Sequence, residues 1–341
     1  MHLLVIRTSA MGDVALLTPV LQGMRDQYPD VEITLVTRKS FESFFYSIEG
    51  LKLFHPDFKN KHKGLGGIIR MFRELKLLNP DSIIDLHDVL RTKVLRKLFS
   101  FSGVPVYVID KGRRDKRAVI KGRRKTGLKH AVNRYCDVFA EAGYQVLPSG
   151  IPVIKPQARG IDEIRDIVLD SSIMNIGVAP YAKHKLKMWP EDNIKKLLQL
   201  ISERRKIKLW LFGGDDVIEK LRELRRLLPG SVIVTEQLSL PGELALMSRL
   251  DLMISMDSSN MHMAALTGIK VISIWGGTDP MTGFSAWKQP DSMAIRIPPD
   301  ELTCRPCTVY GKGNCRRGDF ACMNWLSPEK VFDRMVNLKV I

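Results

Sequence analysis

The sequence predicts an α/β protein built from two successive doubly wound domains. Short apolar runs alternate with amphipathic helical stretches, which is typical of a parallel sheet covered by helices on both faces. A Pro-rich piece at 147–156 interrupts this alternation, which then starts again. A length of 341 residues exceeds one ordinary core and fits two domains. We therefore expect domains at 1–150 and 151–326, followed by a final helix within 327–341.

The first half supplies four predicted strands and four predicted helices in alternation. The strands are expected at 2–7, 31–37, 82–86 and 104–109, and the helices at 13–28, 65–78, 89–99 and 128–143. The segment 111–129 is crowded with Lys, Arg and Gly and breaks the pattern, so we expect a basic loop there.

The second half repeats the rhythm with five predicted strands and five predicted helices. The strands are expected at 174–179, 207–212, 232–235, 252–256 and 271–275, and the helices at 193–204, 217–228, 242–249, 262–266 and 328–337. In open α/β sheets, ligands bind at the carboxyl ends of the strands. The residues that follow each strand are therefore the candidates for function.

Composition narrows the class of protein. An apolar fraction of 45% is that of a globular chain, and no run approaches the roughly 20 apolar residues of a membrane span. Arg7 and Asp13 stand where a signal peptide needs its apolar segment, so we expect a cytoplasmic protein. The net charge of +16 indicates an anionic partner (nucleotide phosphates, nucleic acid, or an acidic membrane or glycolipid surface), with solubility alone as the alternative.

The loop after the first strand contains Gly12 and Asp13. Gly12 allows a ligand to approach the backbone closely. Asp13 is interpreted either as a helix cap or as a general base that takes a proton from an acceptor hydroxyl. The loop lacks the G-x-G-x-x-G pattern, so a dinucleotide fingerprint is absent.

Three loops of the second half have anion-binding character. Lys187, with Lys183 and Lys185 nearby, could neutralise a diphosphate, or the three could form a solvated basic loop. The next two loops offer small polar residues at strand ends: Ser258, Ser259 and Asn260, then Gly276, Gly277 and Thr278. Asp257 has the wrong charge to contact phosphate and could position its loop or bond a hydroxyl. His262 either faces a ligand or packs in the core.

Taken together, these pieces resemble glycosyltransferase family 9, the ADP-heptose:lipopolysaccharide heptosyltransferases. The resemblance spans nearly the whole chain, and the ordered set of motifs carries it. The motifs are Arg7-x-Ser9-x-x-Gly12-Asp13, Lys187-x-Trp189-Pro190, Asp257-Ser258-x-x-x-His262 and Gly276-x-Thr278-Asp279-Pro280. One departure is Ser259, which stands where the family commonly has Gly and could narrow the pocket or change donor preference.

The resemblance implies a GT-B fold with the acceptor site in the first domain and the nucleotide-sugar site in the second. It implies an inverting transfer that needs no metal or other cofactor, with Asp13 as base and Lys187 stabilising the leaving diphosphate. It also implies that the loop 257–262 borders the donor and that the final helix packs back on the first domain.

On the acceptor side, we expect Ser9 and Gly12 to contact a phosphorylated glycolipid. Arg113 and Arg114, in the basic segment, are expected to face the same acceptor or the anionic inner membrane, where the enzyme would lie peripherally. A solvated loop is the alternative for that segment. Cys136 stands alone and is expected to be a buried apolar residue.

The remaining four cysteines lie within 19 residues, at Cys304, Cys307, Cys315 and Cys322. They fit either a tetrahedral structural zinc site or plain reduced thiols.

Two rival functions would also explain part of the sequence pattern. A nucleotide-sugar epimerase would need no acceptor, and a nucleic-acid-binding protein would use the charge. The chain shows no aromatic-interleaved basic platform, so no nucleic-acid partner is expected.

Overall fold

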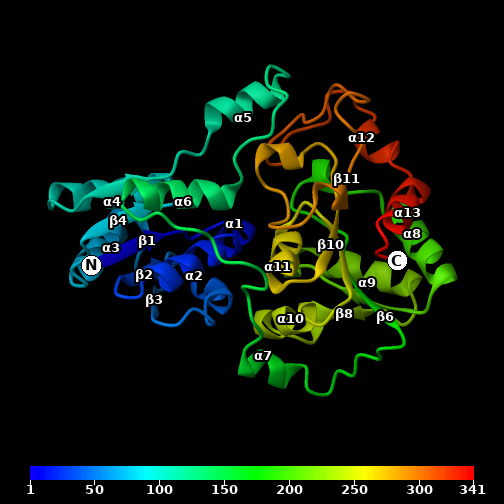
Figure 1. Cartoon of the computed structure of the whole chain (residues 1–341), viewed down its shortest axis with the longest axis horizontal. Helices are drawn as coiled ribbons and strands as arrows, with labels where there is room; N and C mark the ends of the chain where they lie inside the picture. Colours follow the sequence, from blue (N-terminus) through cyan, green and yellow to red (C-terminus); the bar gives the residue numbers. More distant parts are fainter. The chain divides into compact units, whose positions relative to one another are not determined.

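The computed structural model describes all 341 residues and divides into two compact units. The first comprises Met1–Lys111 and Ala131–Val153, and the second comprises Gly112–His130 and Ile154–Ile341 (Figure 1). The second unit therefore includes the basic segment, which the sequence had placed in the first domain. None of the helices is long and apolar enough to cross a bilayer.

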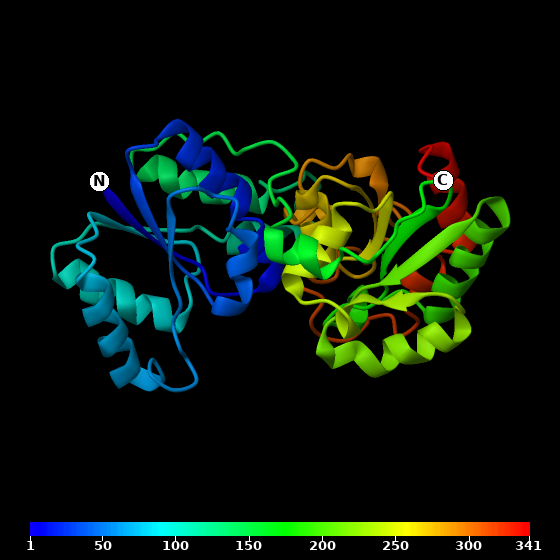
Figure 2. The same cartoon turned by 90° about the horizontal axis from the view of Figure 1, so that it is seen from below.

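The first unit contains a five-stranded parallel sheet with the strand order β3-β2-β1-β4-β5. Its strands are β1 (His2–Ile6), β2 (Glu32–Val36), β3 (Leu51–Phe54), β4 (Ser82–Asp85) and β5 (Val106–Val108). Its helices are α1 (Met11–Ala15), α2 (Thr18–Gln27), α3 (Gly64–Lys76), α4 (Leu90–Phe101) and α6 (Ala131–Glu141), with a 3₁₀ helix at Lys39–Phe44. Helices α2 and α6 lie on one face of the sheet, and α3 and α4 on the other (Figure 2).

The second unit contains a six-stranded parallel sheet with the order β11-β10-β9-β6-β7-β8. Its strands are β6 (Met174–Ala179), β7 (Ile207–Leu211), β8 (Val232–Ile233), β9 (Leu252–Met256), β10 (Lys270–Ile274) and β11 (Ala294–Ile295). Its helices are α5 (Arg113–Ile120), α7 (Ala158–Glu163), α8 (Glu191–Arg204), α9 (Ile218–Leu227), α10 (Leu240–Met247), α11 (Ser259–Thr267), α12 (Ala321–Asn324) and α13 (Pro328–Asn337). Five 3₁₀ helices complete it, at Lys185–Lys187, Asp215–Val217, Val234–Glu236, Pro280–Thr282 and Asp291–Met293.

Both strand orders are of the Rossmann type and contain a topological switch point. The order reverses between β1 and β4 in the first unit, and between β6 and β9 in the second. Loops that leave the carboxyl ends of these paired strands diverge to opposite faces, which opens a place for a ligand. The two candidate sites lie at these two positions.

The first predicted helix, 13–28, is divided in the structure. Helix α1 ends at Ala15, and α2 begins at Thr18 with Pro19 in its first turn. Proline has no backbone N–H, so it favours the start of a helix over its interior. The break gives the loop that follows β1 a short helix of its own.

Helix α13, the expected final helix, packs within the second unit. It contacts α8, and its buried residues Val331 and Met335 belong to the apolar core of the second unit. Val340 and Ile341 join the same core. The apolar face of the C-terminal segment is thus buried within the second unit.

The basic segment differs from the expectation, because it contains α5 where a loop was expected. Lys116 on α5 is buried, and its ammonium group lies 4.4 Å from the centre of the Phe284 ring. Farther along, the Leu128 N–H donates to the Met281 carbonyl at 2.8 Å. These contacts explain why the segment belongs to the second unit.

Candidate active site

Asp13 lies in the first turn of α1, just beyond β1. Its carboxylate is 2.6 Å from the Arg7 guanidinium, and the two side chains are 27% and 8% exposed respectively. The N-cap of α1 is Ala10, so Asp13 is not the helix cap that was one of its two interpretations. The structure instead holds a partly open carboxylate against a buried cation.

Arg7 is fixed by its surroundings. Its guanidinium donates to the Leu86 carbonyl and lies 5.7 Å from the centre of the Tyr135 ring. The Tyr135 hydroxyl donates to the backbone carbonyl of Asp13 at 3.1 Å. The ion pair is therefore held from the end of β4 and from α6, and Asp13 has little freedom to turn away.

The end of β4 carries a second polar cluster. The Asp85 side chain is fully buried, accepts from the backbone N–H groups of His87 and Asp88 at 2.9 Å each, and pairs with Arg96 at 2.9 Å. The His87 ring nitrogens lie 3.1 Å from the Thr8 hydroxyl and 2.9 Å from the Ser9 hydroxyl. The loops after β1 and β4 therefore meet across the switch point.

Burial, reinforced by the charges of Arg7 and Lys111, lowers the pKa of His87 to about 4. The carboxylates of Asp85 and Asp13 oppose this effect without overcoming it. His87 is therefore a neutral imidazole at neutral pH, with one ring nitrogen that donates a hydrogen bond and one that accepts.

In the second unit, the loops after β6 and β9 meet in the same way. The Lys187 ammonium is 2.8 Å from the Asp257 carboxylate, with side chains 16% and 7% exposed. The same carboxylate oxygen accepts a hydrogen bond from the buried Thr278 hydroxyl at 2.8 Å. Asp257 therefore orients the Lys187 ammonium, and this ion pair accounts for a negative charge in a loop expected to bind an anion.

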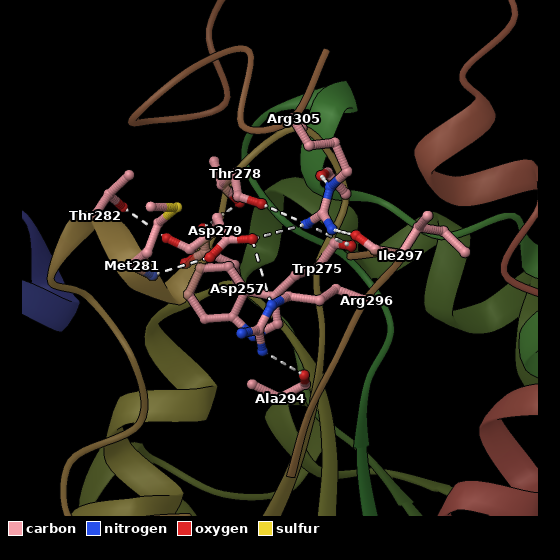
Figure 3. A network of polar contacts seen from close by, with 12 residues as sticks. Asp257, Trp275, Thr278, Asp279, Met281, Thr282, Ala294, Arg296, Ile297 and Arg305 are labelled. Atoms are coloured by element: carbon pink, nitrogen blue, oxygen red, sulfur yellow. Dashed lines mark hydrogen bonds and ion pairs between the residues drawn. The ribbon is translucent and has the colours of Figure 1, made fainter. Parts of the chain in front are cut away.

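Arg305 holds the loop after β10 in place (Figure 3). Its buried guanidinium donates to the carbonyls of Trp275, Gly276, Thr278 and Ile297. It also lies 3.5 Å from the Asp279 carboxylate, which Arg296 approaches at 3.4 Å. Thr278 is consequently fixed where its hydroxyl reaches Asp257.

Gly276 and Gly277 differ from their expected role of leaving room for a ligand. A Cβ on Gly276 would lie 2.3 Å from the Met323 side chain and 2.8 Å from the Leu186 carbonyl. The Gly277 N–H donates to that same carbonyl at 2.8 Å. A Cβ on Gly277 would lie 3.0 Å from the Cys307 sulfur and 3.2 Å from the Leu186 side chain. Packing against the loop that carries Lys187 therefore leaves no room for a Cβ at Gly276 and little at Gly277.

The other residues expected at the donor site occupy α11 and the 3₁₀ loop. Ser258 is the N-cap residue of α11, Ser259 and Asn260 are partly exposed in its first turn, and His262 is buried one turn in. Lys183 is exposed. Ser258, Ser259 and Asn260 therefore follow β9 directly after Asp257.

A pocket of about 300 Å³ lies beside the Lys187 loop in the second unit. Tyr181, Trp189 and Phe320 are among its lining residues, and Lys185 lies with its ammonium 5.0 Å from the centre of the Phe320 ring. Lys185 thus borders this pocket, while Lys187, two residues later, pairs with Asp257.

The residues expected to bind the acceptor are divided between the units. Ser9 and Gly12 are partly exposed in the loop after β1 of the first unit. Arg113 and Arg114 are exposed at the start of α5 in the second unit. The expectation that all four belong to one domain is therefore corrected.

The cysteine cluster does not support the structural zinc site. All four thiols are free, and no group of three or more His, Cys, Asp or Glu side chains could hold a metal ion. Cys307 packs against Gly277, and burial raises the pKa of Cys322 to about 11, which keeps it a neutral thiol. These cysteines fit the alternative of reduced thiols that fill space.

Sequence reasoning missed Arg7 as the partner of Asp13, His87 as a bridge between loops, and Arg305 as a brace. A signal existed for His87, because Asp85-Leu86-His87-Asp88 spans the end of the predicted strand 82–86 and carries three ionisable residues. No pattern pointed to Arg305, since its partners are backbone carbonyls.

The chain is similar to known heptosyltransferases. The chain is 25% identical over 327 residues to the lipopolysaccharide heptosyltransferase 1 of Escherichia coli, covering 89% of this chain and 94% of that one. A glycosyl transferase family 9 structure from Veillonella parvula superposes with a TM-score of 0.75 at 19% identity, covering 99% and 96% of the two chains.

A third comparison is with E. coli heptosyltransferase WaaC bound to ADP-2-deoxy-2-fluoro heptose. It gives a TM-score of 0.66 at 18% identity and covers 99% of this chain and all of that one. The two structural likenesses show the GT-B fold. The model of glycosyltransferase family 9 (heptosyltransferase) matches residues 68–310, which is most of the chain. This chain therefore belongs to glycosyltransferase family 9 and is a glycosyltransferase.

Proposed function

We propose that the protein transfers a heptose from ADP-heptose to a lipopolysaccharide core or another cell-envelope acceptor, with inversion at the anomeric carbon. Membership of the heptosyltransferase family supports the sugar. The solved E. coli heptosyltransferase with an ADP-linked fluoroheptose supports the nucleotide by analogy. The observation that carries the proposal is the partly exposed carboxylate of Asp13, held against Arg7 at the first unit's switch point.

The proposed reaction is a single displacement. The acceptor oxygen attacks the anomeric carbon while Asp13 takes its proton, and the bond from that carbon to the diphosphate oxygen breaks. The bonding electrons leave with ADP. A positioned carboxylate contributes roughly 10²- to 10⁴-fold to such a step. Arg7 does not move the proton, but it holds the carboxylate in one orientation.

In the proposed mechanism, Lys187 stabilises the charge that develops on the departing diphosphate. Its ammonium is already desolvated and aimed by Asp257, so little reorganisation accompanies the bond cleavage. Lysine has three donors, which allows it to keep Asp257 while it contacts phosphate. Ser258, Ser259, Asn260 and His262 are the proposed neighbours of the donor, with Lys183 as a further cation. Gly276, Gly277 and Thr278, which follow β10, are the proposed residues that support this site.

The acceptor is proposed to be a phosphorylated glycolipid at the cytoplasmic face of the inner membrane. Ser9 and Gly12 would contact its sugar, and the exposed guanidinium groups of Arg113 and Arg114 would contact its phosphates or the anionic lipid around it. The net charge of +16 favours such a surface. No cofactor is assigned to the transfer.

The decisive experiment measures donor preference and transfer together. Calorimetry with ADP, UDP and GDP is expected to give binding with ADP at least about tenfold tighter than with the other two. Mass spectrometry should then detect one added heptose on a truncated lipopolysaccharide core supplied with ADP-heptose. Preference for UDP, or conversion of a nucleotide-sugar to its epimer without acceptor, would contradict the proposal.

A further inference from the structure

The loop that carries Asp13 is held by one side chain from the neighbouring strand. The His87 ring contacts the Thr8 hydroxyl through Nδ1 at 3.1 Å and the Ser9 hydroxyl through Nε2 at 2.9 Å. Both ring nitrogens are thus used on successive residues of the loop, and the side chain is buried. Thr8 and Ser9 lie between Arg7 and Asp13 in the sequence, so the bridge acts on the segment that joins the ion pair.

His87 is itself firmly anchored. Its backbone N–H donates to the fully buried Asp85 carboxylate at 2.9 Å, and Arg96 neutralises that carboxylate from α4. The neighbouring Leu86 carbonyl accepts a hydrogen bond from Arg7. The end of β4 therefore holds the loop after β1 at three consecutive residues, 7, 8 and 9.

Burial is the main reason that His87 keeps a neutral ring, and the surrounding charges modify this effect. Arg7 and Lys111 disfavour a further cation, while Asp85 and Asp13 act in the opposite direction. In either tautomer, a neutral ring donates to one hydroxyl and accepts from the other, so both hydrogen bonds are satisfied. A protonated ring would place a second cation beside the Arg7–Asp13 pair and compete for its carboxylate.

We propose that His87 is a positioning residue for the transfer reaction, which ties Thr8 and Ser9 to the end of β4 and so fixes Asp13 for attack by the acceptor. This inference rests on the proposed role of Asp13 as base. His87 acts through the two hydroxyl residues and is not a catalytic residue. Displacements of about 1 Å in such a group can cost 10²-fold in rate.

The first test replaces His87 with a ring that has no hydrogen-bonding atoms. His87→Phe is expected to lower kcat for heptosyl transfer by at least about tenfold, with the KM for the donor and the calorimetric affinity for ADP unchanged. His87→Gln can still reach one hydroxyl through its amide and should recover part of kcat. Thermal unfolding of both variants establishes that they are folded.

The second test asks whether His87 works through Thr8 and Ser9. In a Thr8→Val, Ser9→Ala background the two contacts are already gone, so adding His87→Phe should change kcat by less than about twofold. If the His87 ring only fills space, His87→Phe should lower the melting temperature in both backgrounds. Its loss in kcat would then multiply with the loss caused by Thr8→Val and Ser9→Ala. Wild-type kcat in His87→Phe, or multiplied losses, would overturn the inference.

Asp13→Asn is measured alongside to separate this inference from the proposed function. If Asp13→Asn retains turnover, the base assignment fails, and with it the function proposed for the first unit. If Asp13→Asn abolishes turnover while His87→Phe is normal, only the positioning role of His87 fails.

Discussion

The switch points of the two units are built from the same parts with the charges exchanged. In the first unit the buried partner is the cation Arg7, and the more exposed partner is the carboxylate of Asp13. In the second unit the buried partner is the carboxylate of Asp257, and the more exposed partner is the ammonium of Lys187. In each unit the ion pair fixes one charge and leaves the other able to meet a substrate.

This difference explains how one fold can serve two tasks. Parallel sheets of this type place loops at the carboxyl ends of the strands but do not dictate their chemistry. An exposed carboxylate suits proton removal, and an exposed ammonium suits an anionic leaving group. A buried partner of opposite sign keeps each group in one orientation before substrate arrives. Five expected outcomes test this comparison and the packing around it.

The largest effect is expected at Asp13. Asp13→Ala removes the proposed base and should lower kcat for transfer by roughly 10²- to 10⁴-fold, with ADP affinity unchanged because the proposed donor site lies in the other unit. Stopped-time assays with radiolabelled donor measure the rate, and calorimetry measures ADP binding. Arg7 would be left as an unpaired buried cation, so Asp13→Asn is the matched variant that keeps the size of the side chain. Near-normal turnover in both variants would contradict the base assignment.

The second effect is expected at Lys187, where, unlike at Asp13, the affinity for ADP should change together with kcat. Lys187→Met keeps the stem and removes the ammonium, so kcat should fall by about 10²-fold and the affinity for ADP should fall with it. Lys185→Met is the matched control, because Lys185 borders the neighbouring pocket and does not pair with Asp257. An unchanged rate and unchanged ADP affinity in Lys187→Met would remove this lysine from the site.

The third effect concerns stability and again differs between the units. The pKa of His87 is about 4 in the folded protein against 6.5 for an unperturbed histidine, so only the unfolded chain binds this proton at intermediate pH. The free energy of unfolding should therefore fall by about 3 kcal/mol as pH drops from about 6.5 to about 4. His87→Gln should remove that slope in denaturant titrations, and an unchanged slope would contradict it.

Glu243 in the second unit should give the opposite slope. Burial raises its pKa to about 7 from 4.5, although a hydrogen bond from Thr235 opposes the shift. The folded protein then keeps a proton that the unfolded chain has lost, so the free energy of unfolding falls by about 3 kcal/mol as pH rises from about 4.5 to about 7. Glu243→Gln should flatten this limb and leave the acid limb of His87 intact.

The sequence was informative where local pattern decides the structure. The alternation of strands and helices predicted nine of the eleven strands and missed the edge strands β3 and β11. The motif residues Asp13, Lys187 and Asp257 do lie after strands at the switch points. It was uninformative where contacts join distant segments. The basic segment belongs to the second unit, where Lys116 contacts Phe284. The hydrophobic periodicity of the sequence does not encode that contact.

The glycines of the second unit show the same limit in a different form. A Gly-Gly pair after a strand is compatible with a ligand pocket or with close packing, because both require the absence of a side chain. Only the position of Leu186 and Met323, far away in the sequence, decides for packing. Likewise the spacing of the four cysteines is compatible with a metal, but the structure brings no three of them into a group that could hold one.

The smallest effect tests that packing. Gly276→Ala places a methyl group against the Leu186 carbonyl and Met323, so it should lower the free energy of unfolding by about 1–3 kcal/mol. Because Leu186 precedes Lys187, the affinity for ADP should fall as well. Gly66→Ala in α3 of the first unit is the matched control, since its Cβ would meet no atom within 4 Å, and it should stabilise the chain by up to about 1 kcal/mol. Equal, small effects of the two substitutions in urea titrations would mean that the Lys187 loop tolerates displacement. The ammonium would then be positioned by Asp257 alone.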